Sequence, residues 1–171
     1  MVIVSQPTFA PSKVLEVALA LREDGSPPDL CFGTDEKPIH VGQCLIYAVR
    51  FSDEDIWAVR IPVHQNGTLP PSSISGIVED EMAMLTKLWN LGFRWSPKLI
   101  GGDSTFDNSL GHPYLVMTWV HGTSLDWTPS VPADQQTRCK ILRQLADIQL
   151  DLVYCTMEKR KDSLVPMPSS H

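Results

Sequence analysis

The sequence lacks the features of membrane, secreted and nucleic-acid-binding proteins. No apolar run is long enough to span a bilayer, and Pro7 and Pro11 interrupt the segment where a secretion signal would lie. The formal net charge is -6 and basic residues cluster only at residues 159–161, so we expect no nucleic-acid partner. These absences predict a cytoplasmic protein that contacts neither a membrane nor a nucleic acid.

Cysteine and histidine are too scattered for the common metal sites. The four cysteines, Cys31, Cys44, Cys139 and Cys155, form no C-x-x-C pair, and the histidines have no metal-like spacing. A Cys31–Cys44 disulfide and four reduced thiols both fit the sequence, and a cytoplasmic location favours reduced thiols. We therefore predict no metal ligand, and no Ser/His/Asp grouping indicates a hydrolase.

The sequence does contain enough apolar residues for one folded domain. Hydrophobic residues make up 43% of the 171, which is typical of a globular chain. Two alternating runs, residues 44–51 and 56–61, are joined by four polar residues, a pattern that predicts an antiparallel strand pair. Three helices are also expected, at residues 12–21, 76–91 and 133–154, the last of them long and amphipathic. Three further strands are expected at residues 30–32, 95–101 and 113–120.

The strand at residues 56–61 and the helix after it give the first indication of a binding site. Side chains alternate along a strand, so Ala58 and Arg60 share one face. A small residue followed by a long cation suits a flat, anionic ligand. In helix 76–91, Glu81 falls at the centre of an apolar arc, and a carboxylate that faces the interior needs a partner, for which Arg60 is the candidate. The arc consists of Ile77, Val78, Met84, Leu85, Leu88 and Trp89.

Four stretches follow one another in an order that resembles a known family. They are residues 42–47 (GQCLIY), 58–62 (AVRIP), 81–85 (EMAML) and 113–122 (PYLVMTWVHG). In the small lobe of the aminoglycoside phosphotransferase and choline-kinase-like family, the first stretch is similar to the glycine-containing first turn and the second to the third strand. The third stretch is similar to the first helix, and the fourth to the fifth strand with its hinge. The resemblance is greatest to fungal members and covers roughly residues 40–150.

The resemblance implies an α+β fold, the small lobe of a protein-kinase-like protein. Such a lobe is an antiparallel β-sheet of about five strands with one packed helix, here followed by a long helix that begins a large lobe. The implied domains are an N-terminal helical extension (residues 1–26) and the kinase-like small lobe (27–122). They are followed by a linker with the first helix of an incomplete large lobe (123–156) and by a tail that we expect to be disordered (157–171).

The resemblance also implies a phosphate site for ATP and its Mg²⁺. Arg60 would hold the nucleotide phosphates and pair with Glu81, and Gly42 would let the backbone approach those phosphates. The alternative is that Arg60 and Glu81 form a purely structural ion pair, which ties the helix to the sheet and binds no ligand.

An adenine site is implied next to the phosphate site. Ala58 would form its floor, and Met117 would lie behind the base. The backbones of Thr118 and Val120 would hydrogen-bond to the edge of the base.

The family's catalytic half is not matched. Relatives carry a His-Gly-Asp loop, whose Asp orients the acceptor hydroxyl, followed by an Asn and an Asp that hold magnesium. Residues 121–123 (HGT) have no Asp, and the long helix is not followed by such a loop. We therefore expect a truncated or degenerate phosphotransferase relative with no catalytic residue, no metal ligand and no activity alone. Its partner would be a complementary large-lobe chain or a second copy, and its small-molecule acceptor is not predicted.

Two other interpretations stay open. One is a non-catalytic binding or assembly module, in which the apolar face of helix 133–154 docks onto another protein or a second copy. The other is an unrelated small α+β domain, which would require a different order of strands in the sheet.

Overall fold

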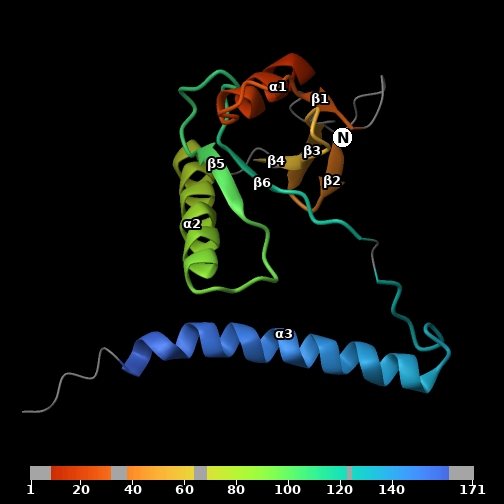
Figure 1. Cartoon of the computed structure of the whole chain (residues 1–171). Helices are drawn as coiled ribbons and strands as arrows, with labels where there is room; N and C mark the ends of the chain where they lie inside the picture. Colours follow the sequence, from red (N-terminus) through yellow and green to blue (C-terminus); the bar gives the residue numbers. More distant parts are fainter. Residues whose placement is uncertain (1–8, 32–37, 64–68, 123–124, 162–171) are drawn as a thin grey trace, which may run out of the picture. The chain divides into compact units, whose positions relative to one another are not determined.

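An antiparallel β-sheet with a helix on each face is the main feature of the computed structural model, which describes residues 9–31, 38–63, 69–122 and 125–161 (Figure 1). The described residues within 1–86 and 97–120 form one compact unit, and those within 87–96 and 121–171 form a second. The sheet and the candidate site belong to the first unit.

Within the described residues, the sheet has six strands in the order β1-β3-β4-β6-β5, and β2 also pairs with β3. All pairings are antiparallel, including the predicted pair β3 and β4. The α+β class is therefore confirmed. The strands are β1 (Asp29–Leu30), β2 (Ile39–Val41), β3 (Cys44–Arg50), β4 (Ile56–Pro62), β5 (Leu99–Asp103) and β6 (Tyr114–Thr118), and the helices are α1 (Pro11–Ala20), α2 (Pro71–Asn90) and α3 (Gln135–Lys161).

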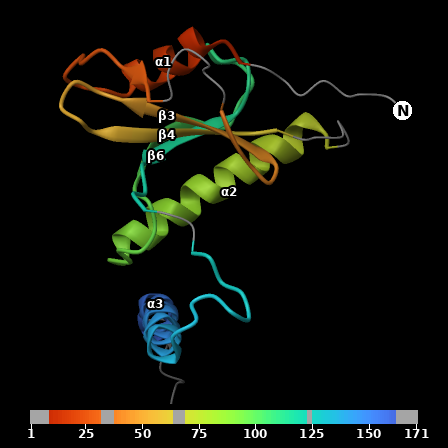
Figure 2. The same ribbon diagram turned by 90° about the vertical axis from the view of Figure 1, so that its right-hand side faces the viewer.

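Side-chain alternation along β4 builds a separate core on each face of the sheet. On one face, Trp57, Val59 and Ile61 pack in a cluster with residues of α1 and β3. On the other face, Ala58 packs in a second cluster with Val78 of α2. Figure 2 shows α1 and α2 on these opposite faces. The predicted two-faced character of this strand is thus confirmed.

The structure has two packed helices where we expected one. Helix α1 buries Val14, Val17 and Ala18 in the cluster on its face of the sheet. It is therefore part of the core of the first unit and not an appendage to it. The periodicity of α1 predicted a helix but could not show which surface the helix covers.

Several element boundaries differ from prediction. Helix α2 begins at Pro71 and not at residue 76, because proline fits the first turn of a helix, where its missing N–H has no intrahelical partner. Strand β5 covers Leu99–Asp103, later than the predicted residues 95–101. Strand β2 was not predicted at all, since three residues are too few to show a period.

Helix α3 is longer than predicted. It begins at Gln135 and continues to Lys161, past residue 154 and into the segment expected to be a disordered tail. Residues 162–171 lie outside the described part of the chain. Asp134 precedes the helix, and its carboxylate accepts hydrogen bonds from the Thr137 N–H at 2.7 Å and hydroxyl at 2.6 Å. Among the described helices, none combines the length and apolarity needed to cross a membrane.

Candidate functional site

Arg60 on β4 and Glu81 on α2 form an ion pair, with the Arg60 Nη1 group donating to Glu81 Oε1. This confirms the contact between the two residues that the sequence predicted. The side chains remain 30% and 23% exposed, so the pair is partly open to solvent. A guanidinium held in a fixed orientation at a partly open position can still bind an anion.

The position of Glu81 on α2 differs from prediction. Of the expected apolar arc around it, Val78 and Leu85 are buried, whereas Ile77 and Met84 are 47% and 53% exposed. At about 100° per residue, Glu81 lies between the buried pair and the exposed pair. The carboxylate is therefore at the edge of the helix's buried face and not at its centre, which explains why the ion pair is accessible.

A pocket of about 370 Å³ lies beside Arg60. Its lining includes Gly42 and Cys44 at the β2–β3 turn, Pro62 on β4 and Ile77 on α2. Gly42 has a φ of 58°, in the left-handed region that glycine adopts without strain. The pocket therefore combines one cation, a tight glycine turn and apolar walls, which suits a ligand with an anionic group.

The predicted adenine-site residues Ala58 and Met117 lie directly opposite each other in the register of β4 and β6. Both belong to the cluster on the α2 face of the sheet, at 7% and 9% exposure, and neither lines the pocket beside Arg60. Ala58 and Arg60 are two residues apart on one strand face, or about 7 Å. A flat ligand could therefore extend from the pocket toward the rim of this pair.

The backbones of Thr118 and Val120 were predicted to bind the edge of the base. The Thr118 N–H already donates to the Lys98 carbonyl oxygen at 2.9 Å, and its hydroxyl accepts from the Lys98 N–H at 3.0 Å. Val120 is 68% exposed, beyond the end of β6. The structure therefore brings Arg60 into contact with Glu81 and places it in one pocket with Gly42, while the Thr118 N–H is already bonded within the sheet.

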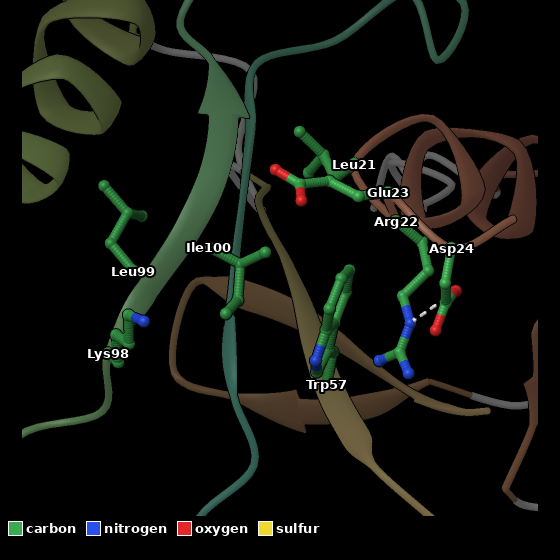
Figure 3. Close-up of a pocket in the computed structure, with 8 residues that line it drawn as sticks. All are labelled: Leu21, Arg22, Glu23, Asp24, Trp57, Lys98, Leu99 and Ile100. Atoms are coloured by element: carbon green, nitrogen blue, oxygen red, sulfur yellow. Dashed lines mark hydrogen bonds and ion pairs between the residues drawn. The ribbon is translucent and has the colours of Figure 1, made fainter. Parts of the chain in front are cut away.

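A second pocket, of about 440 Å³, lies on the α1 face of the sheet and was missed by the sequence analysis. Figure 3 shows Glu23 reaching across it from the end of α1 and Trp57 lying at its base. Beside it, Arg22 donates to Asp24, Asp53 and Asp55. We call these four residues the Arg22 cluster. No spacing rule in the sequence brings residues 22–24 and 53–55 together, so this cluster had no detectable signal.

The charges of the Arg22 cluster are satisfied within it. The hydrogen bond to Asp24 is the largest cause of the raised pKa of the Arg22 guanidinium, and Arg22 in turn lowers the pKa of the Asp24 and Asp53 carboxyls. The guanidinium also lies 4.5 Å from the centre of the Phe51 ring. We therefore interpret the cluster as a structural tie between the end of α1 and the β3–β4 turn.

The described side chains are grouped neither as a metal site nor as a disulfide. Among the residues that the structure describes, no three or more His, Cys, Asp or Glu side chains are grouped to hold a metal ion. Cys31 and Cys44 are free thiols, as are Cys139 and Cys155. The disulfide that the sequence allowed is therefore not formed.

Comparisons of the chain with family models, with curated proteins and with solved structures found no match. We therefore infer the function from the residues and their geometry.

Proposed function

We propose that this chain is a small-lobe relative of the aminoglycoside phosphotransferase and choline-kinase-like family, which binds the phosphates of ATP at Arg60 but does not transfer them by itself. The observation that carries the proposal is the Arg60–Glu81 ion pair across the junction of β4 and α2. The resemblance implies this pair, and the two residues are far enough apart in the sequence that local structure alone does not bring them together.

The chemistry of the pair suits a phosphate. Arginine has several N–H donors in one plane, and only Nη1 of Arg60 is used by Glu81 in the ion pair. Glu81 therefore fixes the orientation of the guanidinium while other N–H groups can contact phosphate oxygens. The turn at Gly42, in the same pocket, has no side chain to exclude a phosphate from the backbone.

The nucleoside would lie along β4 toward Ala58 and Met117. These two residues lie on the same face of the sheet as Arg60 and are 7% and 9% exposed, so the base would contact only their exposed rim. Ala58 and Arg60 are about 7 Å apart along the strand, so a base at the first and a phosphate at the second would occupy neighbouring positions. The proposed order along the strand is therefore base at Ala58, phosphate at Arg60.

Transfer of the phosphate needs groups that the sequence does not supply. Phosphoryl transfer depends on positioning the acceptor and neutralising charge, and each such group can lower the barrier by about 3 kcal/mol or more. The chain has no His-Gly-Asp loop, and the described side chains provide no metal-binding group. Mg²⁺ would arrive bound to the phosphates, and we expect ATP to be bound without being consumed.

The test is an isothermal titration of MgATP into the chain at fixed ionic strength. Arg60→Gln should weaken binding by about tenfold or more, since a hydrogen bond to a charged group contributes roughly 1.5–3 kcal/mol. Arg50→Gln is the matched control, because it removes the same charge from an exposed position on the neighbouring strand β3. It should leave binding within about twofold of the unmodified chain.

Four results would count against the proposal. Absence of MgATP binding to the unmodified chain, or equal weakening by Arg60→Gln and Arg50→Gln, would reject the phosphate site. Normal binding with a loss of stability in Arg60→Gln would leave the ion pair as a structural tie. ATP consumption by the pure chain with a hydroxylated or aminoglycoside acceptor would reject the claim that it is inactive alone.

A further inference from the structure

Helix α3 carries an apolar stripe that nothing within the helix covers. Ile141, Leu145, Ile148 and Leu152 recur at spacings of four, three and four residues. We call these four residues the α3 seam. At about 100° per residue they fall within a band roughly 60° wide, which is the pattern of helices that pack side by side. Leu145 and Leu152 are 47% and 38% exposed, and none of the α3 side chains that the structure describes is buried.

A contact that α3 makes within the second unit lies beside the seam and not on it. Within the second unit, the Trp95 indole N–H donates to the Asp151 carboxylate at 2.8 Å. Asp151 lies about 90° around the helix from the centre of the seam, so this contact lies on its flank. Between Ile141 and Leu152, the two residues nearest the seam are Gln144 and Gln149, and neither carries a charge that would repel an identical helix.

We propose that the α3 seam pairs in an antiparallel direction with the α3 seam of a second copy of this chain. In this register Ile141 lies opposite Leu152 of the second copy, and Leu145 lies opposite Ile148. The seam is self-complementary in this direction because its spacings read the same from both ends. This inference goes beyond phosphate binding and does not depend on it.

Charge favours the antiparallel direction. Lys140 and Asp151 lie on the same flank of the seam, within about 20° of each other around the helix and near opposite ends of it. Antiparallel pairing brings the same flank of both helices together in reverse order. Lys140 of each copy then approaches Asp151 of the other, at both ends of the contact. A parallel pair would place this flank against the flank that carries Leu142 and Gln149, and would form neither Lys140–Asp151 ion pair.

The short length of the α3 seam limits the expected affinity of the dimer. From Ile141 to Leu152 the seam is about 17 Å long at the rise of an α-helix. Interfaces of this size are at the small end of specific association, so we expect a reversible dimer whose population rises with concentration.

Sedimentation velocity over a range of concentrations tests the pairing with two matched variants. Leu145→Asp places a carboxylate in the seam, and Leu150→Asp places one on the opposite side of the same helix, where the leucine is 50% exposed compared with 47% for Leu145. Leu145→Asp should raise the Kd of the dimer by at least roughly 100-fold, because each dimer would bury two unpaired carboxylates. Leu150→Asp should change it less than about threefold.

Circular dichroism of both variants should show unchanged helix content, so that loss of folding is not read as loss of pairing. A monomer at every concentration, or a dimer that Leu145→Asp does not weaken, would overturn the proposal. Equal weakening by the two variants would also overturn it.

Disulfide cross-linking tests the direction of the pair. In a background with the four native cysteines replaced by serine, Ile141→Cys and Leu152→Cys are made as separate variants. The antiparallel register predicts that the mixture of the two forms a disulfide-linked heterodimer on oxidation, while each variant alone forms little. Efficient cross-linking of each variant with itself would show a parallel pair and overturn the proposed direction.

Discussion

Arg60 on β4 donates a hydrogen bond to Glu81 on α2, and this ion pair ties the sheet to the helix at the edge of the α2-face core. The pair is neither buried nor free in solvent. Its position explains how one contact can both stabilise the fold and present a cation to the pocket that contains Gly42.

The coupling between the two residues should be measurable by a double-mutant cycle. We predict that the double variant Arg60→Gln/Glu81→Gln loses less unfolding free energy than the two single variants lose in sum. The difference should be about 1 kcal/mol, as for partly exposed ion pairs. Urea unfolding of the four proteins gives this value. Glu79→Gln, exposed on the same helix, should be additive with Arg60→Gln. Additivity in both cycles would show that the pair contributes nothing.

The two glycines of β5 should differ in their tolerance of a methyl group. A Cβ on Gly102 would lie 2.6 Å from the Tyr114 carbonyl oxygen and 2.9 Å from the Leu115 Cα, both of which are backbone atoms. A Cβ on Gly101 would meet the end of the Leu21 side chain at 2.7 Å, and that side chain can rotate. Gly102→Ala should cost about 3 kcal/mol of unfolding free energy and Gly101→Ala about 1 kcal/mol. Equal losses in denaturant titrations would contradict the packing of β5 against β6.

The Arg22 cluster should contribute to the stability of the first unit. Arg22→Met removes the hydrogen bonds to Asp24, Asp53 and Asp55 and leaves three carboxylates close together. We expect a lower Tm at neutral pH than for the unmodified chain, measured by differential scanning calorimetry. Lys13→Met, which removes a charge from the exposed outer side of α1, is the control and should change Tm little. A Tm equal to that of the unmodified chain would show that the cluster has no structural role.

Acid should remove the contribution of this cluster. The pKa of the Asp24 and Asp53 carboxyls is lowered in the folded chain from an ordinary value of 3.8. The unfolded chain therefore binds protons first as pH falls, so the stabilisation present above the ordinary value is lost as pH falls through the folded values. Between pH 6 and pH 3, the Tm of the unmodified chain should therefore decrease more than the Tm of Arg22→Met, in which these carboxyl pKa values are no longer lowered by Arg22. An equal decrease would show that Arg22 does not lower these pKa values.

The sequence predicted the centre of the fold because burial there is two-sided. The side chains of β3 and β4 alternate between two cores, so a shift of one residue would move every side chain to the other face of the sheet. The period of two in the sequence therefore predicted which face each side chain occupies. The same alternation put Ala58 and Arg60 on one face. With helix periodicity around Glu81, this was enough to predict the Arg60–Glu81 contact.

Features that depend on distant contacts could not be predicted in the same way. Arg22 and Asp53 are 31 positions apart, and the polar run at residues 53–55 has the composition of an ordinary turn. The apolar arc of α2 predicted a buried face wider than the one observed, because periodicity reports how residues are distributed around a helix and not how much of that surface another element covers. Ile77, Met84 and Trp89 were therefore expected inside and are exposed.

Amide chemical-shift mapping during titration with MgATP tests the central claim most directly, because it reports both binding and location. We predict that shifts concentrate at Gly42, Arg60 and Ile77 around the pocket beside Arg60, extend to Met117, and are lost in Arg60→Gln. Shifts that concentrate around Asp24 and the second pocket, or an absence of shifts at millimolar MgATP, would contradict it.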